Sequence, residues 1–159
     1  MPFIIDGHNL LWAIQNTSED SEPVSDVQLC MIISGYLKMT GEKGEIVFDG
    51  TGPRDKDSFN SMGNLEVFFA GRSIEADAII EDKIEASTAP KGLTVVSSDR
   101  RVRDAARARK AIALKSQEFW GEVQKQLSRK LRIKEPPEKR RGISESETKQ
   151  WLKYFGLEQ

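Results

Sequence analysis

The sequence predicts an α/β fold in which helices cover both faces of a mostly parallel sheet. The first observation is that short apolar stretches alternate with longer segments of helical periodicity, in the order β-α-α-β-β-α-β-α-β-α. The second is that several short stretches end at an aspartate followed by a turn, as at the carboxyl ends of parallel strands. The 159 residues suffice for one domain with a small appendage.

Each predicted element follows from a local pattern. Strands are expected where apolar and β-branched residues run together, at 3–5, 45–48, 65–70, 92–98 and 111–114. Helices are expected where apolar residues recur every three or four positions, at 10–14, 27–37, 76–84, 100–110 and 119–127. Ser25 or Asp26 is the expected N-cap of the second helix, Gly41 its end, and Ser116 the cap of the last of these helices. Residues 50–63 are expected to form a long polar loop.

The chain divides into a domain over 1–132, a linker over 133–143 and a final helix over 144–159. The linker combines a proline pair with many charges. Ser144 and Glu147 form a capping-box pattern at the start of the final helix, which carries bulky apolar side chains on one face. We expect that face to dock on the domain or on a partner.

Composition excludes several classes of protein. No apolar run approaches the roughly 20 residues that span a bilayer, and the N-terminus lacks the basic leader of a secretory signal. The single cysteine, Cys30, excludes an intramolecular disulfide and a cysteine-based zinc cluster, and its helical spacing indicates a buried core thiol. The expected location is cytoplasmic.

Charge is distributed unevenly along the chain. Residues 1–99 hold 7 basic and 17 acidic side chains, whereas residues 100–141 hold 15 basic and 5 acidic ones. This asymmetry predicts an acidic site beside a surface for polyanions. The alternative is a solvated basic helix face without a partner.

Four aspartates are placed to meet at one edge of the sheet. Asp6, Asp49 and Asp99 follow predicted strands, and Asp77 lies in the first turn of a helix that follows another strand. Clustered carboxylates repel one another unless a hard cation such as Mg²⁺ compensates their charge. Such an ion activates water and stabilises charge on a phosphodiester under attack. For each position taken alone, a turn or helix-cap role is the open alternative.

Three polar residues accompany these acids. Asn9 either caps a helix or orients the Asp6 carboxylate or a metal-bound water. His8, the only histidine, is expected to be structural, with a substrate contact as the alternative. Ser98 is placed to hydrogen-bond a metal-bound water or a phosphate.

Four motifs resemble the YacP-like branch of the NYN-domain proteins, in the PIN-like nuclease superfamily. They are Ile-Ile-Asp-Gly-His-Asn-Leu at 4–10, Val-Phe-Asp-Gly at 47–50, Glu-Ala-Asp-x-x-Ile at 75–80 and Val-Val-Ser-Ser-Asp at 95–99. The resemblance spans residues 1–128. It implies a PIN-like three-layer α/β/α sandwich and Mg²⁺- or Mn²⁺-dependent ribonuclease activity. It assigns metal-site roles to Asp6, Asp77 and Asp99 and a supporting role to Asn9. Asp49 matches a further acid of the family.

The sequence departs from this pattern directly after Asp99. Many PIN-like nucleases have a further acid there, whereas this chain has Arg100 and Arg101. These arginines start at the predicted metal edge, where they are expected to hold the phosphates flanking a scissile bond. The full set of expected RNA contacts is Arg100, Arg101, Arg103, Arg107, Ser98 and Arg54. Single-stranded RNA is the expected partner, and Phe59 is the loop aromatic that could stack a base.

Three functions are consistent with these features. The first is a metal-dependent endoribonuclease. The second is a non-catalytic RNA-binding or ribosome-associated module with a degenerate nuclease site. The third is a metal-dependent phosphoesterase that acts on small phosphorylated molecules.

Overall fold

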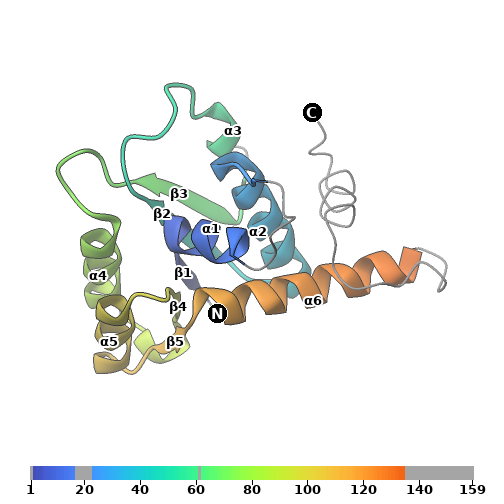
Figure 1. The fold of residues 1–159 in the computed structure, drawn as a ribbon. Helices are drawn as coiled ribbons and strands as arrows, with labels where there is room; N and C mark the ends of the chain where they lie inside the picture. Colours follow the sequence, from blue (N-terminus) through green and yellow to red (C-terminus); the bar gives the residue numbers. More distant parts are fainter. Residues whose placement is uncertain (1, 17–22, 61, 135–159) are drawn as a thin grey trace.

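The computed structural model in Figure 1 describes residues 2–16, 23–60 and 62–134. Its centre is a sheet of five parallel strands in the order β3-β2-β1-β4-β5. The strands are β1 (Phe3–Asp6), β2 (Gly44–Phe48), β3 (Leu65–Phe69), β4 (Thr94–Val96) and β5 (Ile112–Leu114). The chain thus begins in the middle of the sheet, and the predicted parallel sheet is confirmed.

Helices cover both faces of this sheet, as Figure 1 shows. One face carries α1 (Gly7–Gln15), α2 (Asp26–Thr40) and α6 (Ser116–Lys134), and the other carries α4 (Ala76–Ala86) and α5 (Arg100–Ala108). Two short elements, α3 (Asp57–Asn60) and the 3₁₀ turn η1 (Pro90–Gly92), lie in connections. The three-layer α/β/α sandwich is therefore confirmed.

The two hydrophobic cores follow from the two-residue period of a strand. Ile5 packs into the core under α1, α2 and α6, whereas its neighbour Ile4 packs into the core under α4 and α5. Phe48 and Val47 divide in the same way on β2. Strands buried on both faces need apolar residues at every position, which explains the continuous apolar runs in the sequence.

Two predicted segments differ in detail. The polar loop over 50–63 contains α3, because Phe59 is buried and packs edge-on against Phe69 with ring centroids 5.3 Å apart. The strand predicted over 92–98 is shorter, since a 3₁₀ turn occupies its start. Its end leaves the sheet at Ser97, whose N–H still donates to the Leu114 carbonyl at 3.0 Å.

The helix ends confirm two predicted caps. Ser25 and Gln28 form a reciprocal capping box, and Gly41 ends α2 in the left-handed region with φ of 71°. At the start of α6 the Lys115 N–H donates to the Glu118 carboxylate at 3.3 Å. The Ser116 hydroxyl donates to the Asn9 side chain instead.

The C-terminal predictions fall mostly outside the described residues. α6 extends to Lys134 and so includes the first two residues of the predicted linker. The rest of that linker and the final helix over 144–159 lie outside the described residues. In the part of the chain that the structure describes, no helix is both long and apolar enough to span a bilayer.

Candidate active site

Asp6 lies at the end of the central strand and is the most buried of the four acids. Its side chain is held at both oxygens: Oδ1 accepts from the Asn9 N–H at 3.3 Å, and Oδ2 accepts from the Ser97 hydroxyl at 3.1 Å. Burial raises the pKa of Asp6, and these two hydrogen bonds work against that rise. Asp6 is thus a carboxylate of fixed orientation at the N-terminus of α1.

Asp77 lies within electrostatic reach of the other predicted acids. Its pKa is raised to about 6, first by burial and then by the negative charges of Asp6 and Asp99. A hydrogen bond to the side chain of Asp99 and the charge of Asp49 raise the pKa further. Side chains 71 and 22 positions from Asp77 in the sequence therefore lie within electrostatic reach of it.

Ser97 connects two of these acids and was missed from the sequence. Its hydroxyl donates to Asp6 and accepts from the Asp99 N–H at 3.1 Å, and Ser97 is fully buried. Asp99 also caps α5, because its Oδ1 accepts from the Arg101 N–H at 2.8 Å. The available signal was a hydroxyl directly after an apolar run, since a buried hydroxyl requires a partner.

Asp49 caps a helix from another element. Its Oδ1 accepts from the N–H of Ala76, the first residue of α4, at 2.8 Å. The Asp49 N–H in turn donates to His8 Nδ1 at 2.9 Å, so the neutral imidazole carries its proton on Nε2. The 3.5 Å contact between Nδ1 and Asp49 Oδ2 is therefore not a hydrogen bond. Asp49 therefore has the helix-cap role that was its alternative, and its role at a metal site stays a prediction.

Asn9 joins three elements through one atom. Its Oδ1 accepts from the Ser98 N–H at 2.8 Å and from the Ser116 hydroxyl at 3.1 Å. The Ser98 hydroxyl donates to Gln117 Oε1 at 2.7 Å and accepts from the Ser116 N–H at 3.2 Å. The Asn9 side chain thus holds the β4–α5 turn and the start of α6 against α1, and only its backbone contacts Asp6.

We expect Asn9→Ala to lower the free energy of unfolding by about 1–3 kcal/mol, because a partly buried N–H and hydroxyl lose their acceptor. Asn9→Asp keeps that acceptor and should lose less. Urea unfolding measures both variants, with the exposed Asn60→Ala as control. An Asn9→Ala protein as stable as the wild type would show that this junction does not hold the elements together.

The predicted RNA-binding arginines differ in how free they are. Arg101 forms ion pairs with Glu81 and, at 3.6 Å, with Glu75, so it joins α5 to α4. Arg100 is 93% exposed, and its only recorded contact among the described residues is a 3.9 Å contact with Asp104. Arg107 lies 3.7 Å from the same Asp104. Among the remaining candidates Arg103 is partly buried and Arg54 is exposed.

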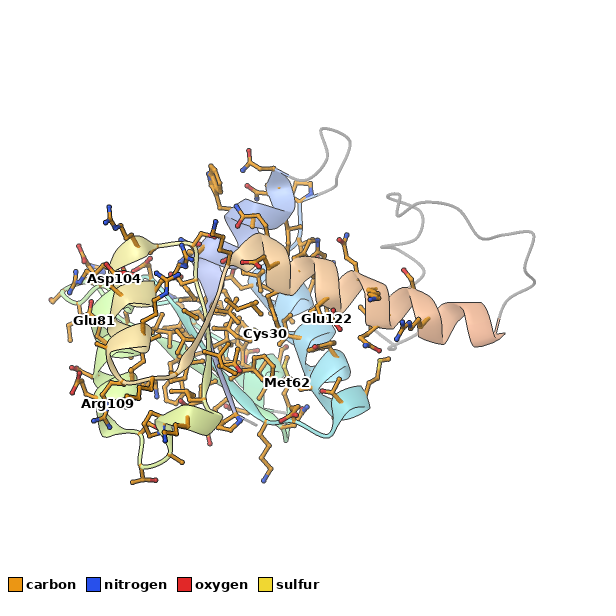
Figure 2. The ribbon with its side chains drawn as sticks, turned by 90° about the horizontal axis from the view of Figure 1, so that it is seen from below. Cys30, Met62, Glu81, Asp104, Arg109 and Glu122 are labelled. Carbon is orange, nitrogen blue, oxygen red and sulfur yellow. The ribbon has the colours of Figure 1, made fainter. Side chains whose placement is uncertain are left out.

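Figure 2 labels side chains from both layers of helices. Glu81, Asp104 and Arg109 lie on the side of α4 and α5, where Arg109 Nη2 donates to the Ser87 carbonyl at 2.9 Å beyond the end of α4. Cys30 lies on the side of α2 and α6. It is fully buried, which confirms the predicted core thiol, and burial raises its pKa.

The donor chemistry of the acidic edge fits a hydrated hard cation. Among residues 2–16, 23–60 and 62–134, no three His, Cys, Asp or Glu side chains form a ready-made ligand set. Asp6, Asp49 and Asp99 each have a carboxylate oxygen that accepts from a protein N–H group. Mg²⁺ typically binds one or two carboxylates and keeps several of its waters, so these carboxylates suffice as its protein ligands.

The parallel sheet with helices on both faces defines the class of this protein, an α/β protein with carboxylates at one edge of the sheet. A model of the YacP-like NYN domain matches residues 3–155, so the chain belongs to that family. This match extends past residue 128, where the resemblance seen in the sequence stops.

Two crystal structures of Rae1 (YacP) from Bacillus subtilis are similar to this chain. One, of a point mutant, has a TM-score of 0.61 at 22% identity over 96% of this chain and 91% of the other. The second has a TM-score of 0.60 at 20% identity over 98% and 92%. Both support the fold. No curated protein matches the chain.

Proposed function

We propose that this protein is a metal-dependent endoribonuclease that hydrolyses RNA phosphodiester bonds at the acidic edge of its sheet. The observation that carries the proposal is that the Ser97 hydroxyl joins the Asp6 carboxylate to the Asp99 backbone, with Asp77 within electrostatic reach of Asp6 and Asp99. Membership of the YacP-like NYN family, with its nuclease-like fold, supports the same function.

Asp6, Asp77 and Asp99 are the residues that would hold Mg²⁺ or Mn²⁺, with Asp49 adding negative charge. Such an ion supplies a water of lowered pKa and neutralises charge on the phosphodiester. The protein's own part is orientation: Ser97 fixes the Asp6 carboxylate, and Asn9 holds the neighbouring turns in place. With its pKa near 6, Asp77 is mostly ionised at neutral pH and ready to bind a cation.

The RNA side of the proposal depends on α5. Its N-terminus begins directly after Asp99, and its exposed Arg100 and Arg107 lie along one face. Such contacts bind phosphates without selecting a base sequence. Arg101 is held by Glu75 and Glu81, so its proposed phosphate contact requires it to share or leave these partners.

Cleavage of labelled single-stranded RNA, single-stranded DNA and a small phosphodiester by the full chain, with and without Mn²⁺, tests the proposal. We expect metal-dependent cleavage of RNA that a chelator abolishes and that Asp6→Asn lowers strongly. Cutting by Asp6→Asn at the wild-type rate would overturn the proposal. RNA that is bound but not cut would favour the non-catalytic RNA-binding or ribosome-associated alternative. Turnover of the small phosphodiester alone would favour the third function.

A further inference from the structure

We propose that Trp12, with His8 one turn before it, forms a stacking surface for a nucleobase of the RNA strand beside the acidic edge. This inference rests on the proposed function and names how that function recognises single-stranded RNA. Phe59, the loop aromatic expected to stack a base, is buried against Phe69, so it is not available for that role.

Trp12 is exposed, and the packing of α1 on the sheet does not involve its side chain. It is 62% exposed, the most exposed large apolar side chain in the described part of the chain. The same helix buries Leu10, Ala13 and Ile14, so α1 packs on the sheet without Trp12. Tryptophan is usually largely buried, and an exposed one marks a contact surface more often than a charged or small residue does.

The position of Trp12 joins it to the acidic edge. His8 and Trp12 are four residues apart on α1 and so lie on the same helix face, about 6 Å apart along the axis. His8 is exposed and contacts Asp49 through its Nδ1, and its ring packs edge-on to Phe48 at 5.6 Å. His8 and Trp12 therefore share one face of α1, and His8 connects that face to Asp49 at the acidic edge.

The charges around the edge favour a base on α1 and phosphates on α5. No Asp, Glu, Lys or Arg side chain lies on α1, so its exposed face offers aromatic surface without a partner for phosphate. The arginines are on α5, and the Asn9–Ser98 hydrogen bond holds the starts of the two helices together. An unpaired strand presents free bases along one side of its backbone, whereas a duplex keeps its bases paired and stacked inside.

Binding of a short single-stranded RNA to the Asp6→Asn background, which keeps the strand intact, tests this inference. We expect Trp12→Ala to weaken binding about tenfold or more, and Trp12→Phe to keep most of the affinity, because stacking needs an aromatic ring. The salt dependence should be unchanged in Trp12→Ala, whereas Arg100→Gln should reduce it. Gln15→Ala, exposed one turn further along α1, is the matched control and should bind normally.

An oligonucleotide with abasic sites separates base from backbone. Wild type and Trp12→Ala should bind it equally. Equal binding of normal RNA by both proteins would overturn the inference while leaving the nuclease proposal intact, provided that the wild type still cuts RNA. The inference would also be overturned if Trp12→Ala changed the sedimentation coefficient of the protein but not its RNA binding. That result would indicate that Trp12 lies in a contact between copies of the chain. Absence of any RNA binding by the wild type would overturn the inference and the proposed function together.

Discussion

Asp77→Asn is expected to lower the rate of RNA cleavage at least about 100-fold while making the metal-free protein more stable. The loss follows because a candidate metal ligand becomes a neutral amide. The gain follows because Asp77 is a carboxylate held among three others, and its pKa of about 6 records how unfavourable its charge is there. Removing one charge relieves that repulsion.

The sign of the pH dependence follows from this raised pKa. The ordinary pKa of an aspartate is 3.8 and that of Asp77 in the folded protein is about 6, so the folded state takes up a proton first as the pH falls. Stability of the metal-free protein should therefore rise as pH falls from above 6 toward 4. Solvent screening reduces the effect to about 1 kcal/mol from the ~3 kcal/mol that two pKa units represent.

Urea unfolding with a chelator, at pH 7.5 and pH 5, measures this difference. The wild type should gain stability relative to Asp77→Asn on moving to the lower pH. Asp82→Asn, an exposed acid one turn and a half further along α4, should behave like the wild type in both stability and cleavage. A pH response in Asp77→Asn equal to that of the wild type would place the titrating charge elsewhere.

Gly7→Ala is expected to lower the free energy of unfolding by about 1–3 kcal/mol and to weaken cleavage as well. A Cβ at position 7 would come within 2.4 Å of the Phe48 ring, which is fully buried and stacked against Phe69 at 5.6 Å. Phe48 also packs against His8, so a displaced ring would disturb the start of α1 beside Asp6. The close approach of α1 to β2 thus requires a glycine here.

Gly121→Ala is the matched control, since Gly121 is a helical glycine whose added Cβ would meet nothing within 4 Å beyond its chain neighbours and its own helix backbone. Replacing glycine by alanine in an exposed helix should raise stability by roughly 0.5–1 kcal/mol. Thermal and urea unfolding of both variants give the comparison. If Gly7→Ala unfolds like Gly121→Ala, the contact between Gly7 and Phe48 does not limit the packing at this site.

The strands, the main helices and the meeting of the acids could be predicted from the sequence. Strands buried on both faces leave continuous apolar runs, and the turn residues after them mark the edge where Asp6 and Asp99 emerge. In any parallel sheet the carboxyl ends of the strands share one edge. Asp77, which follows a strand in the sequence, could therefore be assigned to that edge without knowledge of how the helices pack. The fourth strand starts two residues later than predicted because a 3₁₀ turn begins at Pro90. So short a turn leaves no periodic pattern of apolar residues in the sequence, and it could not be predicted.

The connections between side chains could not be predicted in the same way. Ser97 binds Asp6 across 91 positions, and Ser116 binds Asn9 across 107. Such pairs depend on the strand order and on how helices pack, which local patterns do not encode. Trp12 lies outside the apolar face that Leu10, Ala13 and Ile14 form on α1, and its exposure in the structure is the observation behind the proposed stacking surface.

The most direct test of the central claim is the anomalous diffraction of crystals soaked in Mn²⁺. We expect a peak at the carboxyl edge of the sheet, within about 2–2.5 Å of carboxylate oxygens from Asp77 and at least one of Asp6 and Asp99, and none in crystals of Asp77→Asn. A map with no manganese at that edge, or with these three side chains facing separate surroundings, would contradict a shared metal site.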